Sequence, residues 1–312
     1  MTKILVLEGG FNEEHEISLI TSKEIKKTLT NLQIDFESIE VDPKTFLKKL
    51  SKYNNDYLCF NALHGTFGED GSIQKILEEN QFKYTHANST ASRIAFDKNL
   101  AKETIKHTKI LTLDSLILDK NQLDKNKLLE IYQKYESFVI KPVSSGSSYG
   151  VILVTTLKDV KNLLENLKSV LNIYKNHNSL MIERYVKGRE LTVAVIEREK
   201  ESEAVEVTEI LSKNSFFDYE AKYTKGFSKH ILPANLPNSV YEICLEYSKI
   251  AHDTINCRGV SRSDFIYDNE KIYFLEINSQ PGLTPISLVP EQLEYRNINF
   301  DSLIKNIINS AL

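Results

Sequence analysis

The sequence is short of several features that would point to common classes of protein. Its 312 residues include 3 cysteines, and Cys59, Cys244 and Cys257 show no paired spacing, which argues against a disulfide framework or a cysteine metal site. No apolar run approaches the about 20 residues of a membrane helix. The net charge of −4 offers no basic excess for nucleic acid. These absences predict a cytoplasmic enzyme with reduced core cysteines and neither nucleic acid nor membrane as a partner.

Several catalytic motifs are also missing. There is no Gly-x-Ser-x-Gly elbow, no Cys/His pair, no His-Glu-x-x-His pattern and no Walker A tail of Gly-Lys-Ser/Thr. Phosphoryl transfer needs none of these motifs, because it depends on positioned cations and a held nucleophile.

What the first third does contain is an alternation of short apolar strands and helical patterns. This alternation predicts a parallel, doubly wound sheet whose ligands bind at the carboxyl ends of the strands. The first residues read as a buried strand, since their apolar core is too short for a signal peptide. The expected strands are 4–7, 36–41, 57–63, 137–142, 151–154, 181–184, 191–196 and 205–210; the expected helices are 17–29, 157–174, 240–255 and 300–308. A polar loop at 219–229 is long enough to be a lid.

The stretch from Arg262 to Leu288 carries the most chemical information. Two apolar strands flank the turn-prone residues 268–271, which predicts a β-hairpin. Residues two apart share a strand face, so Glu276 and Asn278 point the same way, and a suitable register brings Asp264 opposite Glu276. Two carboxylates and an amide suit Mg²⁺ that carries substrate phosphates. From this stretch alone, a solvent-exposed polar strand face remains an alternative.

Two lysines are candidates for binding phosphate. Lys98 alone reads most simply as a solvated surface lysine. Lys141 ends an apolar strand and precedes a Ser/Gly loop at 144–150, which could lay backbone N–H groups on phosphate oxygens. A compact ammonium suits the same ligand.

Other polar positions follow strands. Glu183, with Tyr185 and Val186 after it, could form a hinge whose backbone reads an adenine edge, and Glu190 could bind ribose hydroxyls. An ordinary strand end explains the same spacing. The glycine-dense turn after His64 implies close backbone approach. Glu14 could equally be part of a helix N-terminal charge cluster.

Taken in order, these blocks resemble the D-alanine–D-alanine ligase family of the ATP-grasp superfamily. The resemblance runs along the whole chain. The matching blocks are 9–19, 64–74, 97–98, 141–148, 188–193, 218–223, 276–284 and 287–290.

The resemblance implies an α/β, three-domain ATP-grasp fold with an N-terminal Rossmann-like parallel sheet. Its expected domains are 1–95 (N-terminal), 96–180 (central ATP-grasp) and 181–312 (C-terminal, with the metal site and lid). The implied activity is ATP-dependent ligation of two D-alanine molecules through an acyl phosphate, for peptidoglycan precursor synthesis. The implied partners are ATP, D-alanine, two Mg²⁺ or Mn²⁺ ions and a second copy of the chain in a homodimer.

The resemblance also implies roles for individual residues. ATP phosphates would be held by Lys98, Lys141 and Ser148, adenosine by Glu183, Tyr185, Val186 and Glu190, and the metal ions by Asp264, Glu276 and Asn278. Among the catalytic residues, Glu14 would anchor the ammonium of the first D-alanine, and Ser147 and Tyr223 would link Glu14 to the lid. Arg262 and the Gly282 N–H would stabilise the oxyanion. Substrate would also contact His64, Lys222, Ser287 and Leu288.

The sequence departs from the family pattern at a few positions. Asn12 stands where serine is commoner, Ser279-Gln280 replaces the usual threonine and its neighbour, and Ile286 stands where histidine is frequent. Two alternatives to the ligase are a D-alanine–D-lactate ligase, against which Tyr223 argues, and a non-catalytic nucleotide-binding module. The intact set of Lys141, Arg262 and the metal-binding residues argues against the second alternative.

Overall fold

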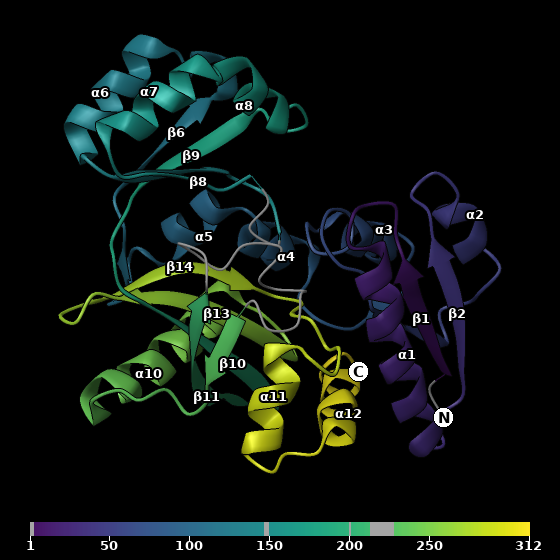
Figure 1. Cartoon of the computed structure of the whole chain (residues 1–312). Coiled ribbons are helices and arrows are strands. Elements are labelled where there is room, and N and C mark those ends of the chain that lie inside the picture. Colours follow the sequence, from purple (N-terminus) through teal and green to yellow (C-terminus); the bar gives the residue numbers. More distant parts are fainter. Residues whose placement is uncertain (1–2, 147–149, 200, 213–227) are drawn as a thin grey trace.

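The computed structural model describes residues 3–146, 150–199, 201–212 and 228–312. Within them the strands form three sheets, and Figure 1 shows each sheet in its own part of the molecule. The N-terminal sheet has the order β2-β1-β3-β4, and its neighbouring strands are parallel. The predicted parallel sheet of an α/β fold is therefore confirmed.

The first strand, β1 (Lys3–Gly9), lies inside the N-terminal sheet because it is apolar on both faces, as a buried parallel strand must be. The helix after it, α1 (His15–Asn31), packs Ile25 and Leu29 against the sheet. The other elements here are β2 (Phe36–Val41), α2 (Phe46–Leu50), β3 (Tyr57–Asn61), α3 (Ser72–Glu79), β4 (Lys83–Tyr84) and α4 (Ser89–Phe96). The carboxyl ends of β1 and β3 thus present the polar segments around Glu14 and His64 at one edge.

A smaller antiparallel sheet of order β6-β9-β7-β8 lies at the top of Figure 1, with helices on its outer face. Two elements that precede it along the chain, α5 (Lys98–Ile105) and β5 (Leu111–Thr112), pack with the largest sheet instead. The small sheet's own region comprises β6 (Ser115–Asp119), a 3₁₀ turn (Lys120–Gln122), α6 (Lys125–Tyr135), β7 (Phe138–Pro142), β8 (Ile152–Val154), α7 (Leu157–Glu165), α8 (Leu167–Ile173) and β9 (Ser179–Arg184). The prediction of one helix over 157–174 was wrong. Asn166, with φ −109° and ψ 15°, ends α7 and begins α8, although the apolar pattern continues across it.

The largest sheet has the order β12-β11-β10-β13-β14-β5. Its elements are β10 (Arg189–Arg198), β11 (Glu201–Ser212), β12 (Ser228–Ile231), α10 (Asn238–Ile255), β13 (Val260–Tyr267), β14 (Ile272–Asn278), α11 (Leu288–Tyr295) and α12 (Phe300–Ser310). The short β5 joins its edge in parallel with β14. The predicted hairpin is confirmed as β13 and β14, which pair antiparallel around the turn at 268–271.

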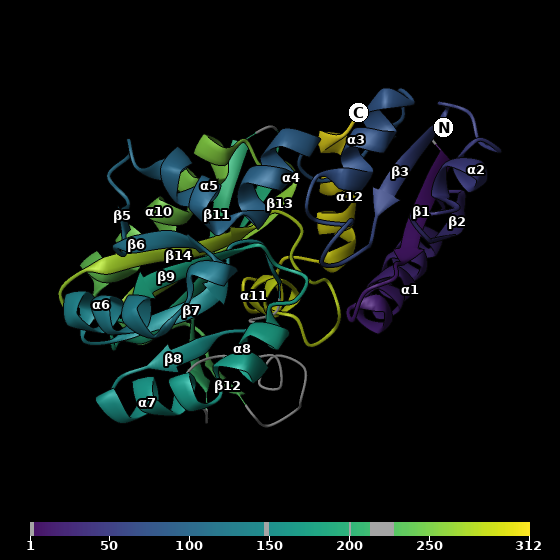
Figure 2. The ribbon, with the colours of Figure 1, turned by 90° about the horizontal axis from the view of Figure 1, so that it is seen from above.

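Helices cover both faces of this large sheet (Figures 1 and 2). On one face α10 buries Cys244, Ala251 and Ile255 against the strands. On the other, α11 and α12 share one apolar core with the N-terminal sheet and α1, which joins the two regions. The three cysteines are buried and unpaired, as predicted. None of the helices in the described ranges combines the length and hydropathy that a membrane crossing requires.

Candidate active site

Two neighbouring cavities meet where the three sheets approach one another. The first, the substrate-side cavity, lies among the loops after β1 and β3, the loop after β7 and the segment between β14 and α11. The second, the nucleotide-side cavity, lies between the small sheet and the β13–β14 hairpin. Lys98, Ser145 and Glu276 line both cavities. Groups bound in the two cavities would therefore meet at these three residues.

The described residues that the sequence predicts for the site line one or both of these cavities. In the substrate-side cavity are Glu14, His64, Lys98, Arg262, Glu276, Asn278, Gly282, Ser287 and Leu288. In the nucleotide-side cavity are Lys98, Lys141, Glu183, Tyr185, Val186, Glu190, Asp264 and Glu276. Ser147, Ser148, Lys222 and Tyr223 lie outside the described residues.

The hairpin brings the expected metal-binding residues together. Asp264 pairs with Glu276 and Arg262 with Asn278 in the antiparallel register, so each pair shares a face of the sheet. The Arg262 guanidinium donates two hydrogen bonds to Asp264, from Nε to Oδ1 at 3.0 Å and from Nη2 to Oδ2 at 2.9 Å. Thr192 on β10 donates to the same Oδ1 at 2.6 Å. Such a bidentate ion pair fixes the position of the Asp264 carboxylate.

These oxygens fit a magnesium ion by their chemistry. Asp264 and Glu276 supply carboxylate oxygens and Asn278 an amide oxygen, which are the hard ligands that Mg²⁺ and Mn²⁺ prefer. The Asn278 amide is held with its Oδ1 accepting from the Gln280 N–H at 2.8 Å. Because that oxygen has two lone pairs, one remains for a ligand.

Lysines and carboxylates alternate at the junction of the cavities. The Lys98 ammonium lies 3.1 Å from Glu276 Oε2 and donates to the Ser145 carbonyl at 2.8 Å. The Lys141 ammonium lies 2.7 Å from Glu183 Oε2, while the buried Lys102 contacts Glu183 Oε1. The cluster thus holds three ammonium groups against two carboxylates. Ammonium groups gathered at this junction suit a phosphate ligand.

Burial changes the proton affinity of these lysines. Desolvation, and then the Lys98 ammonium, lower the pKa of Lys141 to about 8, although Glu276 acts in the opposite direction. Burial also lowers the pKa of Lys102, with Lys141 and Lys98 as further causes. The contact with Glu183 opposes this shift, because a carboxylate at hydrogen-bonding distance favours the charged lysine. Perturbed groups of this kind are typical of functional sites.

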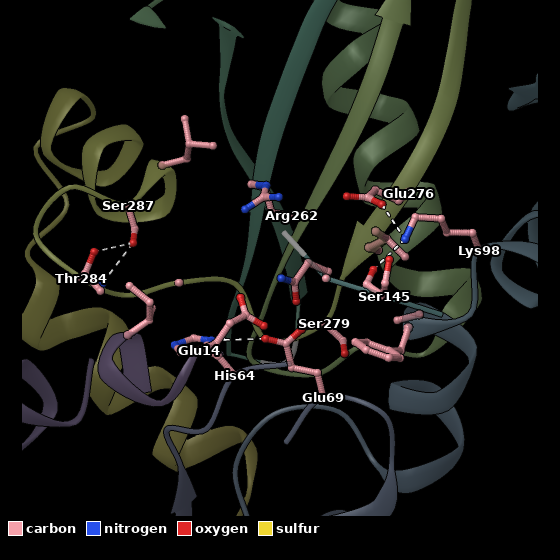
Figure 3. A pocket seen from close by; sticks show the side chains of 18 of the residues that line it. Glu14, His64, Glu69, Lys98, Ser145, Arg262, Glu276, Ser279, Thr284 and Ser287 are labelled. Atoms are coloured by element: carbon pink, nitrogen blue, oxygen red, sulfur yellow. Dashed lines mark hydrogen bonds and ion pairs between the residues drawn. The ribbon is translucent and has the colours of Figure 1, made fainter. Parts of the chain in front are cut away.

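Glu14 and His64 form the floor of the substrate-side cavity in Figure 3. Glu14 is buried at the N-terminus of α1, next to Gly65 and Gly146. His64 Nδ1 lies 3.2 Å from Glu69 Oε1, and its Nε2 lies 2.9 Å from the Thr21 hydroxyl. The two partners fix the plane of the imidazole ring.

The opposite side of this cavity is built by the segment between β14 and α11. Ser287 immediately precedes α11, and its Oγ lies 2.8 Å from the Thr284 hydroxyl, as Figure 3 shows. A Cβ on Gly282 would lie 2.8 Å from the same Oγ, so a larger residue there would push the Ser287 hydroxyl out of this position. The cavity therefore has an acidic end at Glu14 and a hydroxyl-bearing end at Ser287, with Arg262 lining it as well.

Comparison with known proteins adds to this geometry. The family model described as the C-terminus of D-ala D-ala ligase matches residues 100–309. D-alanine–D-alanine ligases from Wolbachia pipientis subsp. Culex pipiens (strain wPip) and Pelagibacter ubique (strain HTCC1062) are each 39% identical over 99% of this chain, which covers 93% and 98% of their lengths. The chain belongs to the D-alanine–D-alanine ligase family.

Solved structures of the family agree. The D-alanine–D-alanine ligase from Bacillus anthracis complexed with ATP superposes with a TM-score of 0.80 at 26% identity, covering 99% of this chain and 96% of that one. The D-alanyl-alanine synthetase A from Vibrio cholerae O1 gives a TM-score of 0.84 at 25% identity over 100% and 99% of the two chains. The three-domain ATP-grasp fold class expected of the family is confirmed.

Several residues at the site were missed by sequence reasoning. Glu69, His230 and Thr284 line the substrate-side cavity, and Lys102 contacts Glu183 from behind the nucleotide-side cavity. Lys102 follows Lys98 by four positions on α5, which is a spacing that puts both on one helix face and could have revealed it. Of the departures from the family pattern, Asn12 donates to the carbonyls of His64 and Thr66, at 2.8 and 3.0 Å.

Proposed function

We propose that this site joins two D-alanine molecules, with the first bound near Glu14 and the second near Ser287 and Leu288. The carrying observation is that Lys98, Ser145 and Glu276 line both cavities. A γ-phosphate held there would lie beside a substrate carboxylate, which is the arrangement that phosphoryl transfer requires. Arg262 fixes the Asp264 carboxylate by hydrogen bonding, and the Gln280 N–H fixes the Asn278 amide. These two fixed oxygen ligands support the same assignment.

The reaction has two steps. A carboxylate oxygen of the first D-alanine attacks the γ-phosphorus, ADP leaves, and an acyl phosphate forms. The amine of the second D-alanine then attacks the acyl carbon, inorganic phosphate leaves, and the amine loses a proton as the peptide bond forms. Arg262 and the Gly282 N–H would stabilise the oxyanion of the second step.

The chain's own residues divide the binding between them. Lys98 and Lys141 would hold the phosphates, and the slot of Glu183, Tyr185, Val186 and Glu190 would hold adenosine. Asp264, Glu276 and Asn278 would hold Mg²⁺ or Mn²⁺, which when bound neutralises charge on the phosphate oxygens. We extend the proposal to Ser147, Ser148, Lys222 and Tyr223 on the resemblance alone.

The resemblance to the family also supports the broader assignments. They are a homodimer that acts in the cytoplasm in peptidoglycan precursor synthesis, and the division into segments 1–95, 96–180 and 181–312.

The direct test measures phosphate release from Mg·ATP with D-alanine, L-alanine, or D-alanine plus D-lactate, and identifies products by mass. Release with D-alanine that yields its dipeptide is the expected result. Mainly ester from the mixture at neutral pH would favour the D-lactate ligase instead. Nucleotide binding without release in saturating D-alanine would contradict a ligase activity.

A substitution at Gly65 tests the assignment of Glu14. Gly65 has a φ of +68°, and a Cβ there would lie 2.3 Å from Glu14 Oε2, so Gly65→Ala should displace the carboxylate. We expect the KM for D-alanine to rise by about tenfold or more, which is the scale of one hydrogen bond to a charged group. The KM for ATP should change little, and steady-state kinetics separate the two.

The matched control is Gly10→Ala. Gly10 also has a positive φ, +95°, but its added Cβ would meet only the Leu63 side chain at an ordinary 3.7 Å. Both variants carry backbone strain, so the difference between them reports the collisions of the Gly65 Cβ, with Glu14 Oε2 at 2.3 Å and with Asn12 Nδ2 at 2.9 Å. Equal effects of the two substitutions on the KM for D-alanine would rule out the proposed role of Glu14.

A further inference from the structure

Lys102 is a buried charged residue that the mechanism above leaves without a role. It lies on α5, one turn after Lys98, and its side chain is 6% exposed. Its ammonium contacts Oε1 of Glu183, a residue 81 positions away on β9. It lies within 3.5 Å of the Leu113 carbonyl as well. Burying a charged lysine costs desolvation free energy, so a buried lysine paired with Glu183 is a candidate for a specific role.

Glu183 is equally buried and lies in a largely apolar slot. Its side chain is 4% exposed, and Leu113, Val139 and Ile266 line the nucleotide-side cavity with it. Its other oxygen, Oε2, accepts from Lys141 at 2.7 Å. An ionised carboxylate in such a place needs a cation at hydrogen-bonding distance, because an uncompensated buried charge is strongly unfavourable.

The two lysines on Glu183 differ in what else they can reach. Lys141 lies on the strand that leads into the 144–146 loop, beside Lys98, and faces the place proposed for the phosphates. Lys102 lines neither cavity in the described structure and has the Glu183 carboxylate as its ionic partner. A phosphate that drew Lys141 away would therefore free Oε2 and leave Lys102 on Oε1.

We propose that Lys102 is a positioning residue that keeps Glu183 ionised and oriented as the acceptor for the exocyclic amino group of the nucleotide base. Lys102 thereby sets the preference for an adenine nucleotide without touching the nucleotide. This inference rests on the proposed nucleotide-side cavity. The inference goes beyond that cavity because it assigns base selection to a lysine that lies behind the binding surface.

The test compares ATP with purine riboside triphosphate, which lacks the 6-amino group and is otherwise alike. Wild type is expected to prefer ATP in kcat/KM. In Lys102→Met, Glu183 loses its fixed cation and becomes either protonated or drawn to Lys141. The ATP preference should then fall by about tenfold, the scale of one hydrogen bond to a charged group. An unchanged preference, with both nucleotides weakened alike, would mean that Lys102 is merely structural.

Lys106→Met is the matched control. Lys106 follows the last residue of α5, is exposed, and pairs on the surface with Glu103. It should leave the ATP preference unchanged, which excludes a general effect of removing a lysine from this helix. A similar loss in Lys106→Met would overturn the inference.

A second comparison covers the case in which Lys102→Met does not fold. The double variant Lys102→Met/Glu183→Gln removes both partners of the buried Lys102–Glu183 ion pair at similar volume, while Lys141 keeps Glu276 as a nearby carboxylate. If Lys102 acts through Glu183, the double variant should have the same ATP preference as the single variant Glu183→Gln. A further loss in the double variant would contradict the inference. Dipeptide formation by wild type tests the proposed function separately, so the two can fail independently.

Discussion

Glu276→Gln should lower kcat/KM for dipeptide formation by about 1,000-fold or more while the protein stays folded. The substitution keeps the side-chain volume but removes the charge that faces Lys98 at 3.1 Å and that is proposed to help hold the metal ions. A loss of that size corresponds to about 4 kcal/mol of transition-state stabilisation, which is the scale of metal-ion catalysis. Phosphate release from Mg·ATP and D-alanine measures it.

Binding of the metal can be followed apart from turnover. Mn²⁺ titrated by electron paramagnetic resonance, with a non-hydrolysable ATP analogue present, should bind the Glu276→Gln variant more weakly. Glu270→Gln is the matched control, since Glu270 lies exposed in the turn of the same hairpin. A variant at position 276 that turns over at a rate near that of wild type would eliminate the metal assignment.

Arg262→Met is expected to have the second largest effect, on both rate and stability. The variant leaves the buried Asp264 carboxylate without its two hydrogen bonds from the guanidinium. Breaking such a pair costs about 3 kcal/mol of unfolding free energy, because a charge stays buried without compensation. Loss of a preorganised oxyanion donor should lower kcat by about 100- to 1,000-fold.

Urea denaturation and steady-state kinetics separate the two effects of Arg262→Met. Arg198→Met serves as a control, because Arg198 lies 3.3 Å from Glu203 and the side chains of both residues are partly exposed. Binding of ATP, measured by calorimetry below the denaturation midpoint, should change much less than kcat. A variant that is destabilised but retains its kcat would show that Arg262 only holds Asp264.

The sequence was most informative where a pattern is local. The alternation around 268–271 predicts the hairpin, and the two-residue period predicts that Glu276 and Asn278 share a face, because strand geometry depends on neighbours along the chain. The parallel N-terminal sheet follows from the same kind of reasoning. The break at Asn166 was missed because helical periodicity records which side of a helix is apolar and continues across a one-residue interruption.

Contacts between distant segments were beyond local patterns. Lys102 meets Glu183 across 81 residues, and Gln280 meets Leu63 across 217. Neither contact can be predicted from a local sequence pattern, because the partners come together only when the sheets pack. Gln280 departs from the family pattern in the sequence, and the structure shows what its side chain contacts. Its amide is buried between the metal hairpin and the N-terminal sheet.

That buried amide has a consequence for how the enzyme can be altered. The Gln280 side chain donates to the Leu63 carbonyl at 2.5 Å and accepts from Asn61 at 2.8 Å, while its backbone N–H holds Asn278. The end of the hairpin and the loop that carries His64 are therefore joined by hydrogen bonds through Gln280. A chimera that exchanges either segment with a relative must carry the complementary residue at position 61 or 280, or the graft will separate the phosphate end of the site from its amino-acid end.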